Sequence, residues 1–362
     1  MTIQDLIPIT PVAPFLYQIE YPFPDKAAET RVFRWLISKL PTSSSLLGIF
    51  VRPFATPTQF PNSTEEDGRI STDCLASEPL LFTNTASITT PSAEVQQESD
   101  QIEVFLHYFG TSLKLYISSE KVLSFERYEI GENGRAVFER EEMQVLYEKS
   151  VLVLSSILDN CFDFRLTVNL SSINELWSEC FISRGKLGYR IPSFKLSLAS
   201  TSLPLEGRNV LEKMNLNLPL IGEDLMDDSL SQKDLDQTLE YNKLKFPRAY
   251  MDDCAKVSHC LRSKRTGSPV SWGMTHGDMA VACLHTLGDY RQRSLGRKVM
   301  YELALKHVDL HRKHLPYEEN ETIYVHADTE TWNDATVKMM QKWGYQSLLK
   351  NEWFSVVPYD IK

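Results

Sequence analysis

The spacing of apolar and polar residues along the chain predicts a mixed α/β protein. In the first half, β-rich runs at residues 102–109 and 112–119 are separated by a glycine and predict a pair of strands. Apolar residues recur at helical spacing over residues 27–40 and 147–158, which predicts two helices. Residues 56–100 are rich in Ser, Thr, Pro and Glu, so we expect a long loop there.

The second half begins with polar segments of helical spacing at residues 207–215 and 231–241. The β-rich runs at residues 255–262 and 268–276 then flank a short basic turn that contains a glycine. This pattern predicts a β-hairpin, which would bring the two runs side by side.

The strongest pattern lies further along the second half. Residues 279–285 are almost continuously apolar, which is typical of a strand that is covered on both faces. A basic loop follows, and then Leu295, Val299 and Leu303 stand four residues apart in a helical run. With a second strand predicted at residues 322–328, the order is strand, basic loop, helix, strand.

The length of 362 residues favours two domains rather than one. Residues 191–206 combine Pro and Ser without a helical period, and we expect the boundary near them. We therefore predict an N-terminal α/β domain over residues 1–200 and a second domain over residues 201–362.

Composition narrows the classes of function. The formal net charge of −10 argues against a nucleic-acid partner, and no apolar run approaches the roughly 20 residues that would predict a membrane span. No positive side chain precedes Lys26, which argues against a secretory or organelle leader. The six cysteines form no CxxC pair and are expected as reduced thiols, so a cytoplasmic location is favoured.

The basic loop after residue 285 has the features of a phosphate site. A loop that leads from a strand into a helix presents unpaired backbone N–H groups and a partial positive charge. Arg291, Arg293, Arg297 and Lys298 cluster there, in a chain that is acidic overall. The sequence contains neither a G-x-x-x-x-G-K-[ST] loop nor a G-x-G-x-x-G motif with its acidic partner, so these nucleotide-binding classes are excluded.

Two motifs in this region resemble those of the GCN5-related N-acyltransferases. YRQRSLGR (residues 290–297) resembles the family's Q/R-x-x-G-x-G/A pyrophosphate loop, with Ser294 in place of the first glycine and Gly296 as the second. NDATVKMMQKWGY (residues 333–345) resembles the N-x-A-S helix that ends in G-F/Y. GSPVSWGMTHGD (residues 267–278) is similar to the glycine N-acyltransferase-like branch, and the resemblance covers roughly residues 263–358.

The resemblance implies a fold and a co-substrate. The fold is a mixed central sheet flanked by helices in the second half, with the N-terminal half a candidate degenerate copy. Acyl-coenzyme A, such as acetyl-coenzyme A, is the implied co-substrate, and a small amine, glycine or another amino acid, is the implied acceptor. The implied cofactor-binding residues are Leu284, His285, Thr286, Arg291, Gln292, Arg293, Ser294, Leu295, Gly296, Arg297, Asn333 and Thr336.

Two residues are candidates for the catalytic base that deprotonates the amine. Asp278 is the nearest counterpart of a glutamate that the branch places in the central strand, but it lies two residues too early. His285 has a reference pKa that suits proton abstraction. Strand alternation predicts that the two face opposite sides. Many members of the family have a tyrosine that protonates the leaving thiolate, and Met340 stands at that position here. The glycine N-acyltransferase-like branch also lacks this tyrosine.

Other functions stay open at this point. His307, His311 and His314 share one helical face, but no further ligand completes a metal shell, so no metal is expected. The departures at Ser294, Met340 and Asp278 leave a catalytically silent acyl-coenzyme A binding protein as an alternative. A protein-interaction role for the N-terminal half and an acetyltransferase acting on peptides are further alternatives. The sequence does not give the oligomeric state.

Overall fold

The computed structural model describes residues 17–19, 34, 80–84, 102–109, 112–162, 164–199, 222–244, 246–314 and 323–359. The helix predicted at residues 207–215 lies outside these ranges, and of the one at residues 27–40 only Arg34, in a helix, is described. The expected loop over residues 56–100 needs a correction at one place, where an apolar run forms strand β2. Residues 191–199 of the segment in which the domain boundary is expected belong to strand β8, whereas the boundary between residues 200 and 201 lies outside the described residues and stays a prediction.

The first half of the chain supplies most of an eight-stranded sheet. Strands β1 to β4 are successively antiparallel, and β7 then runs parallel to β4. The elements are β1 (Tyr17–Ile19), β2 (Leu80–Thr83), β3 (Val104–Phe109), β4 (Ser112–Ile117), α4 (Glu120–Leu123), β5 (Tyr128–Ile130), β6 (Ala136–Phe138), α5 (Glu141–Cys161), β7 (Val168–Asn174), α6 (Glu175–Ile182) and β8 (Lys186–Ala199).

The second half repeats this order. Strands β9 to β12 are antiparallel neighbours in a four-stranded sheet, and a helix leads on to β13, which meets β12 in parallel. The elements are β9 (Leu225–Asp228), η4 (Gln232–Asp234), α8 (Leu235–Tyr241), α9 (Arg248–Ala255), β10 (His259–Ser263), β11 (Pro269–Thr275), β12 (Val281–Thr286), η5 (Gly288–Tyr290), α10 (Leu295–His314), β13 (Tyr324–Glu330), α11 (Asp334–Gln341) and β14 (Gln346–Val357).

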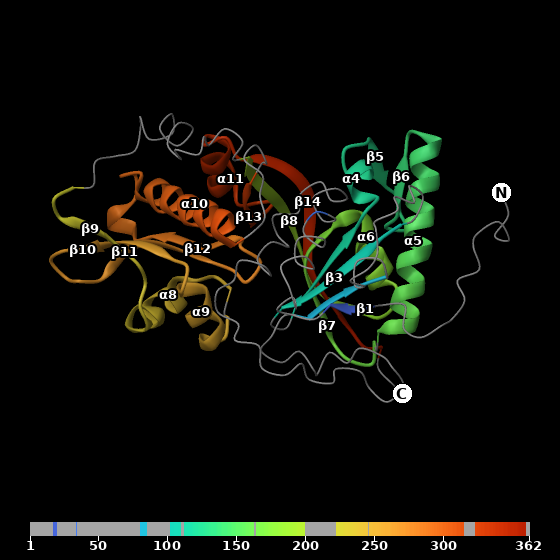
Figure 1. Cartoon of the computed structure of the whole chain (residues 1–362), viewed down its shortest axis with the longest axis horizontal. Coiled ribbons are helices and arrows are strands. Elements are labelled where there is room, and N and C mark those ends of the chain that lie inside the picture. Colours follow the sequence, from blue (N-terminus) through green and yellow to red (C-terminus); the bar gives the residue numbers. More distant parts are fainter. Residues whose placement is uncertain are drawn as a thin grey trace.

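The two repeats exchange their last strands. The large sheet has the order β1-β2-β3-β4-β7-β14-β8-β13, so β14 lies beside β7 of the first repeat and β8 lies beside β13 of the second. Side chains follow the exchange, because Phe354 and Val356 of β14 belong to the core of the first half. Leu196 of β8 belongs to the core of the second half. Figure 1 shows β8 and β14 together between the two halves.

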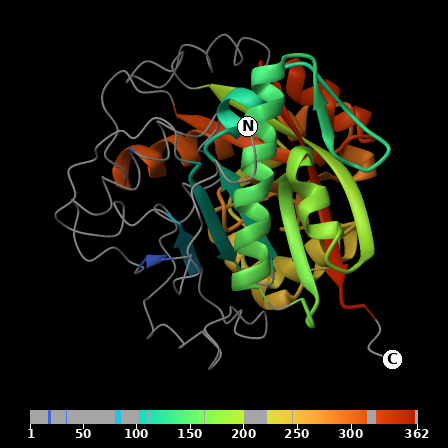
Figure 2. The same cartoon turned by 90° about the vertical axis from the view of Figure 1, so that its right-hand side faces the viewer.

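Helices cover both sheets, as their apolar faces require. Helix α10 packs on one face of the four-stranded sheet, and α8 and α9 pack on the other (Figure 1). Helix α5 lies across the large sheet, as the turned view shows (Figure 2). The predicted fold class, a mixed sheet flanked by helices, is confirmed, and so are the predicted strands and helices that fall in described residues. None of the described helices is long and apolar enough to cross a bilayer.

Candidate functional site

Strands β12 and β13 part from each other to form a cleft. They meet in a single parallel bridge between Ala280 and His326, and in the described part of the chain β12 has no strand neighbour on that side beyond it. The outer edge of β12 therefore faces the cleft instead of another strand. A strand edge of this kind offers backbone N–H and C=O groups to an extended ligand.

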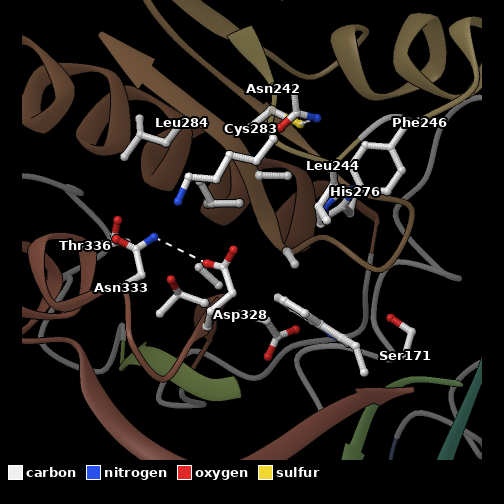
Figure 3. A pocket seen from close by; sticks show the side chains of 18 of the residues that line it. Ser171, Asn242, Leu244, Phe246, His276, Cys283, Leu284, Asp328, Asn333 and Thr336 are labelled. Atoms are coloured by element: carbon white, nitrogen blue, oxygen red, sulfur yellow. Dashed lines mark hydrogen bonds between the residues drawn. The ribbon is translucent and has the colours of Figure 1, made fainter. Parts of the chain in front are cut away.

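A cavity of about 770 Å³ fills this cleft and continues toward the first half of the chain. Figure 3 shows Leu284, Asn333 and Thr336 at one end and Phe246 and His276 at the other. Of the predicted site residues, the cavity is lined by Asp278, Leu284, His285, Arg291, Asn333 and Thr336. Met340 also lines it, where the family more often has a tyrosine.

The loop before α10 presents a row of unbonded amides. Within the described part of the chain, no acceptor is found for the backbone N–H groups of residues 292–296, and the first bonds of the helix run from Arg297 and Lys298 to the carbonyl of Ser294. Gln292 and Ser294 have left-handed φ angles of 61° and 57°. Successive amides in such a conformation form a concave anion-binding surface. Residues 291–294 are exposed, so the amides can be reached from solvent.

The basic side chains at this loop divide into different roles. Arg291 donates from Nε to the carbonyl of Thr286 at 3.0 Å and lines the cavity. Arg293 is paired with Asp224 at 3.3 Å and stacks on Tyr290. Arg297 lies over the ring of Trp343 at 5.4 Å.

Lys298, the fourth basic residue, pairs with Glu302 one helical turn further on. Together with the previous contacts, this shows that the sequence cluster does not point at one place. Arg291 and Arg293 are the cations that lie at the exposed loop itself.

The alternation of side chains in β12 and in the turn before it is interrupted between Asp278 and His285. Met279 and Cys283 have left-handed φ angles of 63° and 52°, and the register with β11 shifts between Trp272 and Met274. These are the marks of a β-bulge, which reverses the side on which later residues point. Asp278 and His285 both line the cavity, as do all the residues from Ala280 to Leu284, so the prediction that the two face opposite sides stays a prediction.

His285 is held between two aromatic rings. Its centroid lies 4.9 Å from that of Trp272 and 5.0 Å from that of Tyr241. Burial and the nearby Arg291 guanidinium lower the pKa of His285, so its imidazole is neutral at neutral pH. It lies near the end of β12 that leads to the phosphate loop.

Asp278 is buried in an ion pair that joins the two halves. Its Oδ2 contacts Nζ of Lys114 from β4, and its Oδ1 accepts a bond from the amide of Ala280 at 3.2 Å. Burial opposes the charge, but the ammonium of Lys114 and the nearby His326 hold the pKa of Asp278 well below its usual range. A carboxylate held in this way is a poor acceptor of a proton at neutral pH. The geometry therefore favours a structural role, and its role as a base stays a prediction.

One group of side chains could be considered for a metal. Asp278, His326 and Asp328 have ligand atoms within 4.8 Å of one another. However, Lys114 contacts Asp278, and Lys195 is buried near both carboxylates, where burial lowers the pKa of Lys195 and the charges of Asp328 and Asp278 oppose that lowering. A metal ion bound by Asp278 would have to displace Lys114.

The histidine face of α10 is buried in the protein interior. Burial lowers the pKa of His307 and His311, and the Nε2 of His307 lies 2.8 Å from the hydroxyl of Thr275. The side chain of His314 is not among those described. The expectation that the protein holds no metal stays a prediction.

Sequence reasoning missed a histidine at the vertex of the cleft. His276 lines the cavity, and its Nδ1 lies 2.7 Å from the hydroxyl of Tyr250 in α9. No partner is found for Nε2 in the described part of the chain. Burial lowers the pKa of His276 to about 4, so the ring is neutral at neutral pH. The only sequence signal was its place two residues before Asp278 in GMTHGD.

Comparisons with known proteins give a shared fold. Neither the protein-family models nor the curated protein sequences match this chain. An X-ray structure of a Drosophila protein is similar, at 11% identity and a TM-score of 0.57, over 95% of this chain and 99% of that one. This likeness shows a common fold and carries no information about activity.

Two further solved structures are similar at lower scores. The tandem GNAT protein from the clavulanic acid biosynthesis pathway has 11% identity and a TM-score of 0.39, over 94% of this chain and 97% of that one. A GCN5-related N-acetyltransferase from Sphaerobacter thermophilus has 9% identity and a TM-score of 0.38, over 95% of each chain.

Proposed function

We propose that the protein transfers an acyl group from acyl-coenzyme A to the amine of a small acceptor, with glycine or another amino acid among the candidates. The observation that carries the proposal is the row of unbonded amides at residues 292–296, which lies beside the open edge of β12. The amides suit a diphosphate, and the strand edge suits the amide-containing pantetheine arm. Leu284 to Thr286, Asn333 and Thr336 are proposed to border the same ligand.

The length of β12 places the reacting thioester. The diphosphate is expected at the loop, and the thioester is at the far end of the pantetheine arm. Ala280 and Thr286 are six residues apart, which is roughly 20 Å at the rise of a strand. The acyl group is therefore expected near the vertex of the cleft, close to Ala280, rather than beside His285.

The reaction needs a proton acceptor at that vertex. The amine nitrogen forms a bond to the thioester carbon, the carbon–sulfur bond breaks, and the amine proton passes to a base while the thiolate takes up a proton. His276 is the candidate that the geometry adds to Asp278 and His285, because its Nε2 is unbonded and Tyr250 fixes the ring. A weak base is sufficient at this step, since the attacking nitrogen becomes strongly acidic once it has bonded to the carbon.

A matched pair of variants at Gly296 tests the ligand. A Cβ there would come no closer than 3.5 Å to Thr286 Oγ1, which is an ordinary van der Waals contact. In a thermal-shift series with acetyl-coenzyme A, wild type and Gly296→Gln are expected to gain stability by about 2.7 kcal/mol at one hundred times Kd. Gly296→Glu has the same size but sets a negative charge among the amides, and should gain none. Equal shifts for the Glu and Gln variants would refute the phosphate site.

Thiol release separates transfer from silent binding. Left-handed Ser294 and the ion-paired Asp278 are the observations that favour a silent acyl-coenzyme A binding protein. Free coenzyme A that appears only when an amine is added supports transfer. If acetyl-coenzyme A causes a thermal shift but no amine of a panel releases coenzyme A, the result would support the catalytically silent alternative.

A further inference from the structure

The end of the cavity that is farthest from the phosphate loop is built by both halves of the chain. From the first repeat it receives Tyr189 and Ile191, whereas the side chain of Leu170 belongs to the core of the first half. Trp353 of the exchanged strand β14 pairs across the sheet with Ile191. Phe246 and Tyr250 from the second half complete the lining. We call the five side chains of Tyr189, Ile191, Trp353, Phe246 and Tyr250 the acceptor chamber.

The chamber is apolar, and part of it is open to solvent. Its walls are aromatic and aliphatic, and Tyr189 is 44% exposed although it lines the cavity. The ammonium of Lys114 is near by, but Asp278 neutralises it. Apolar side chains that are left in contact with water around a hollow are typical of a site for an apolar ligand.

Several polar side chains line the same cavity, and one of them, Asp328, stands between the chamber and the acyl cleft. Figure 3 shows Asp328 between Asn333 and Thr336 on one side and Ser171 on the other. Its Oδ1 is buried and receives no hydrogen bond from the described residues. Lys195 is buried near this carboxylate and interacts with it electrostatically, and the open oxygen can accept an N–H group. A neutral amine is the form that attacks a thioester.

We infer that the acceptor is a small primary amine with an aromatic or similarly apolar body, which fills the chamber and donates an N–H group to Asp328. This inference rests on the proposed function and makes its substrate class specific. The strands β8 and β14 wall the chamber on the side of the first repeat. The first half of the chain is then part of the substrate site.

Binding is measured first, because it does not depend on turnover. Isothermal titration of 2-phenylethylamine and of ethylamine into the full chain, in the presence of coenzyme A, compares the same amine with and without a ring. Burial of the ring is expected to give at least a roughly tenfold tighter Kd. Equal affinities, or no binding of either amine, would overturn the inference.

Variants at Tyr189 locate the ring. Tyr189→Ala should weaken the binding of 2-phenylethylamine by roughly threefold or more and leave ethylamine unchanged, whereas Tyr189→Phe should behave as wild type. Phe125→Ala is the matched control, since Phe125 is 62% exposed and does not line the cavity. If Tyr189→Ala and Asp328→Asn, as two single variants, both leave the Kd for 2-phenylethylamine unchanged, the inference is also overturned.

Turnover then separates this inference from the proposed function. With acetyl-coenzyme A, kcat/KM for 2-phenylethylamine should exceed that for glycine and for a lysine-containing peptide by roughly tenfold or more. A preference for glycine or the peptide would overturn the chamber but leave acyl transfer in place. If binding depends on the ring but no amine releases coenzyme A from acetyl-coenzyme A, the result would support the chamber and would refute the proposed acyl transfer.

Discussion

Lys114 and Asp278, which are 164 positions apart in the sequence, form a buried ion pair whose two side chains are each 2% exposed. The pair links β4 of the first repeat to the turn before β12 of the second. The other oxygen of Asp278 holds the amide of Ala280, which is also the residue that bridges to His326. A charge from one half of the chain thereby fixes the point at which the cleft of the other half opens.

A double-mutant cycle tests this link. Lys114→Met leaves an uncompensated buried carboxylate and should lower the free energy of unfolding by about 3–5 kcal/mol. Asp278→Asn alone leaves the ammonium unpaired but keeps the oxygen that bonds Ala280. The double variant should lose clearly less than the sum of the two, as measured by denaturant titration. Additive losses would mean that the two charges do not interact.

Ser294 is expected to strain the phosphate loop. Its φ of 57° lies in the left-handed region, which glycine adopts without a steric cost. Ser294→Gly should raise the free energy of unfolding by up to about 1 kcal/mol and leave the affinity for acyl-coenzyme A equal or tighter. Ser294→Ala, which keeps the side-chain carbon, should show no such gain. Both free energies of unfolding are measured by scanning calorimetry. A loss of stability in Ser294→Gly would contradict the prediction.

The buried histidines predict loss of stability in acid. Burial lowers the pKa of His311 to about 3, whereas in the unfolded chain it is about 6.5. The unfolded state therefore binds the proton more tightly, and stability that is present above pH 6.5 is lost as the pH falls toward 3. Between pH 7 and pH 5 this residue accounts for about 2 kcal/mol. His311→Leu should reduce the pH dependence of the unfolding free energy by that amount, and an unchanged slope would show that His311 does not titrate in this way.

His276 and Tyr250 should differ in their effects on turnover. His276→Gln removes the proposed proton acceptor and should lower kcat by about 10²–10⁴-fold. Tyr250→Phe only releases the ring and should cost less. Binding of acyl-coenzyme A, followed by thermal shift, should be unchanged in both variants. Because the pKa of His276 is about 4, activity at saturating amine should persist well below pH 6.5. A wild-type rate in His276→Gln would return the role of base to His285 or Asp278.

The local elements of the second half could be predicted because their signals are local. The apolar run of β12, the basic loop and the spacing of Leu295, Val299 and Leu303 lie within a few turns of chain. The hairpin of β10 and β11 likewise depends on a nearby turn. These patterns do not need distant partners to be recognised.

The bulge and the shared walls could not be predicted from the same signals. Cys283 adopts a left-handed conformation although it is not a glycine, so the residue type at that position does not predict the break in β12. The sequence around Lys114 does not indicate an ion pair, because its partner Asp278 is 164 positions away. The role of His276 could not be predicted because Tyr250, which fixes its ring, lies 26 positions away in the sequence.

The exchange of β8 and β14 has a consequence for any attempt to dissect the chain. A fragment that starts after β8 would carry β14 without β7, and the apolar side chains of Phe354 and Val356 would lose the surface that covers them. The complementary fragment would end in β8, and Leu196 would be stranded in the same manner. The two pieces are therefore expected to regain structure only when they are produced together, as interlocked halves of one cooperative unit.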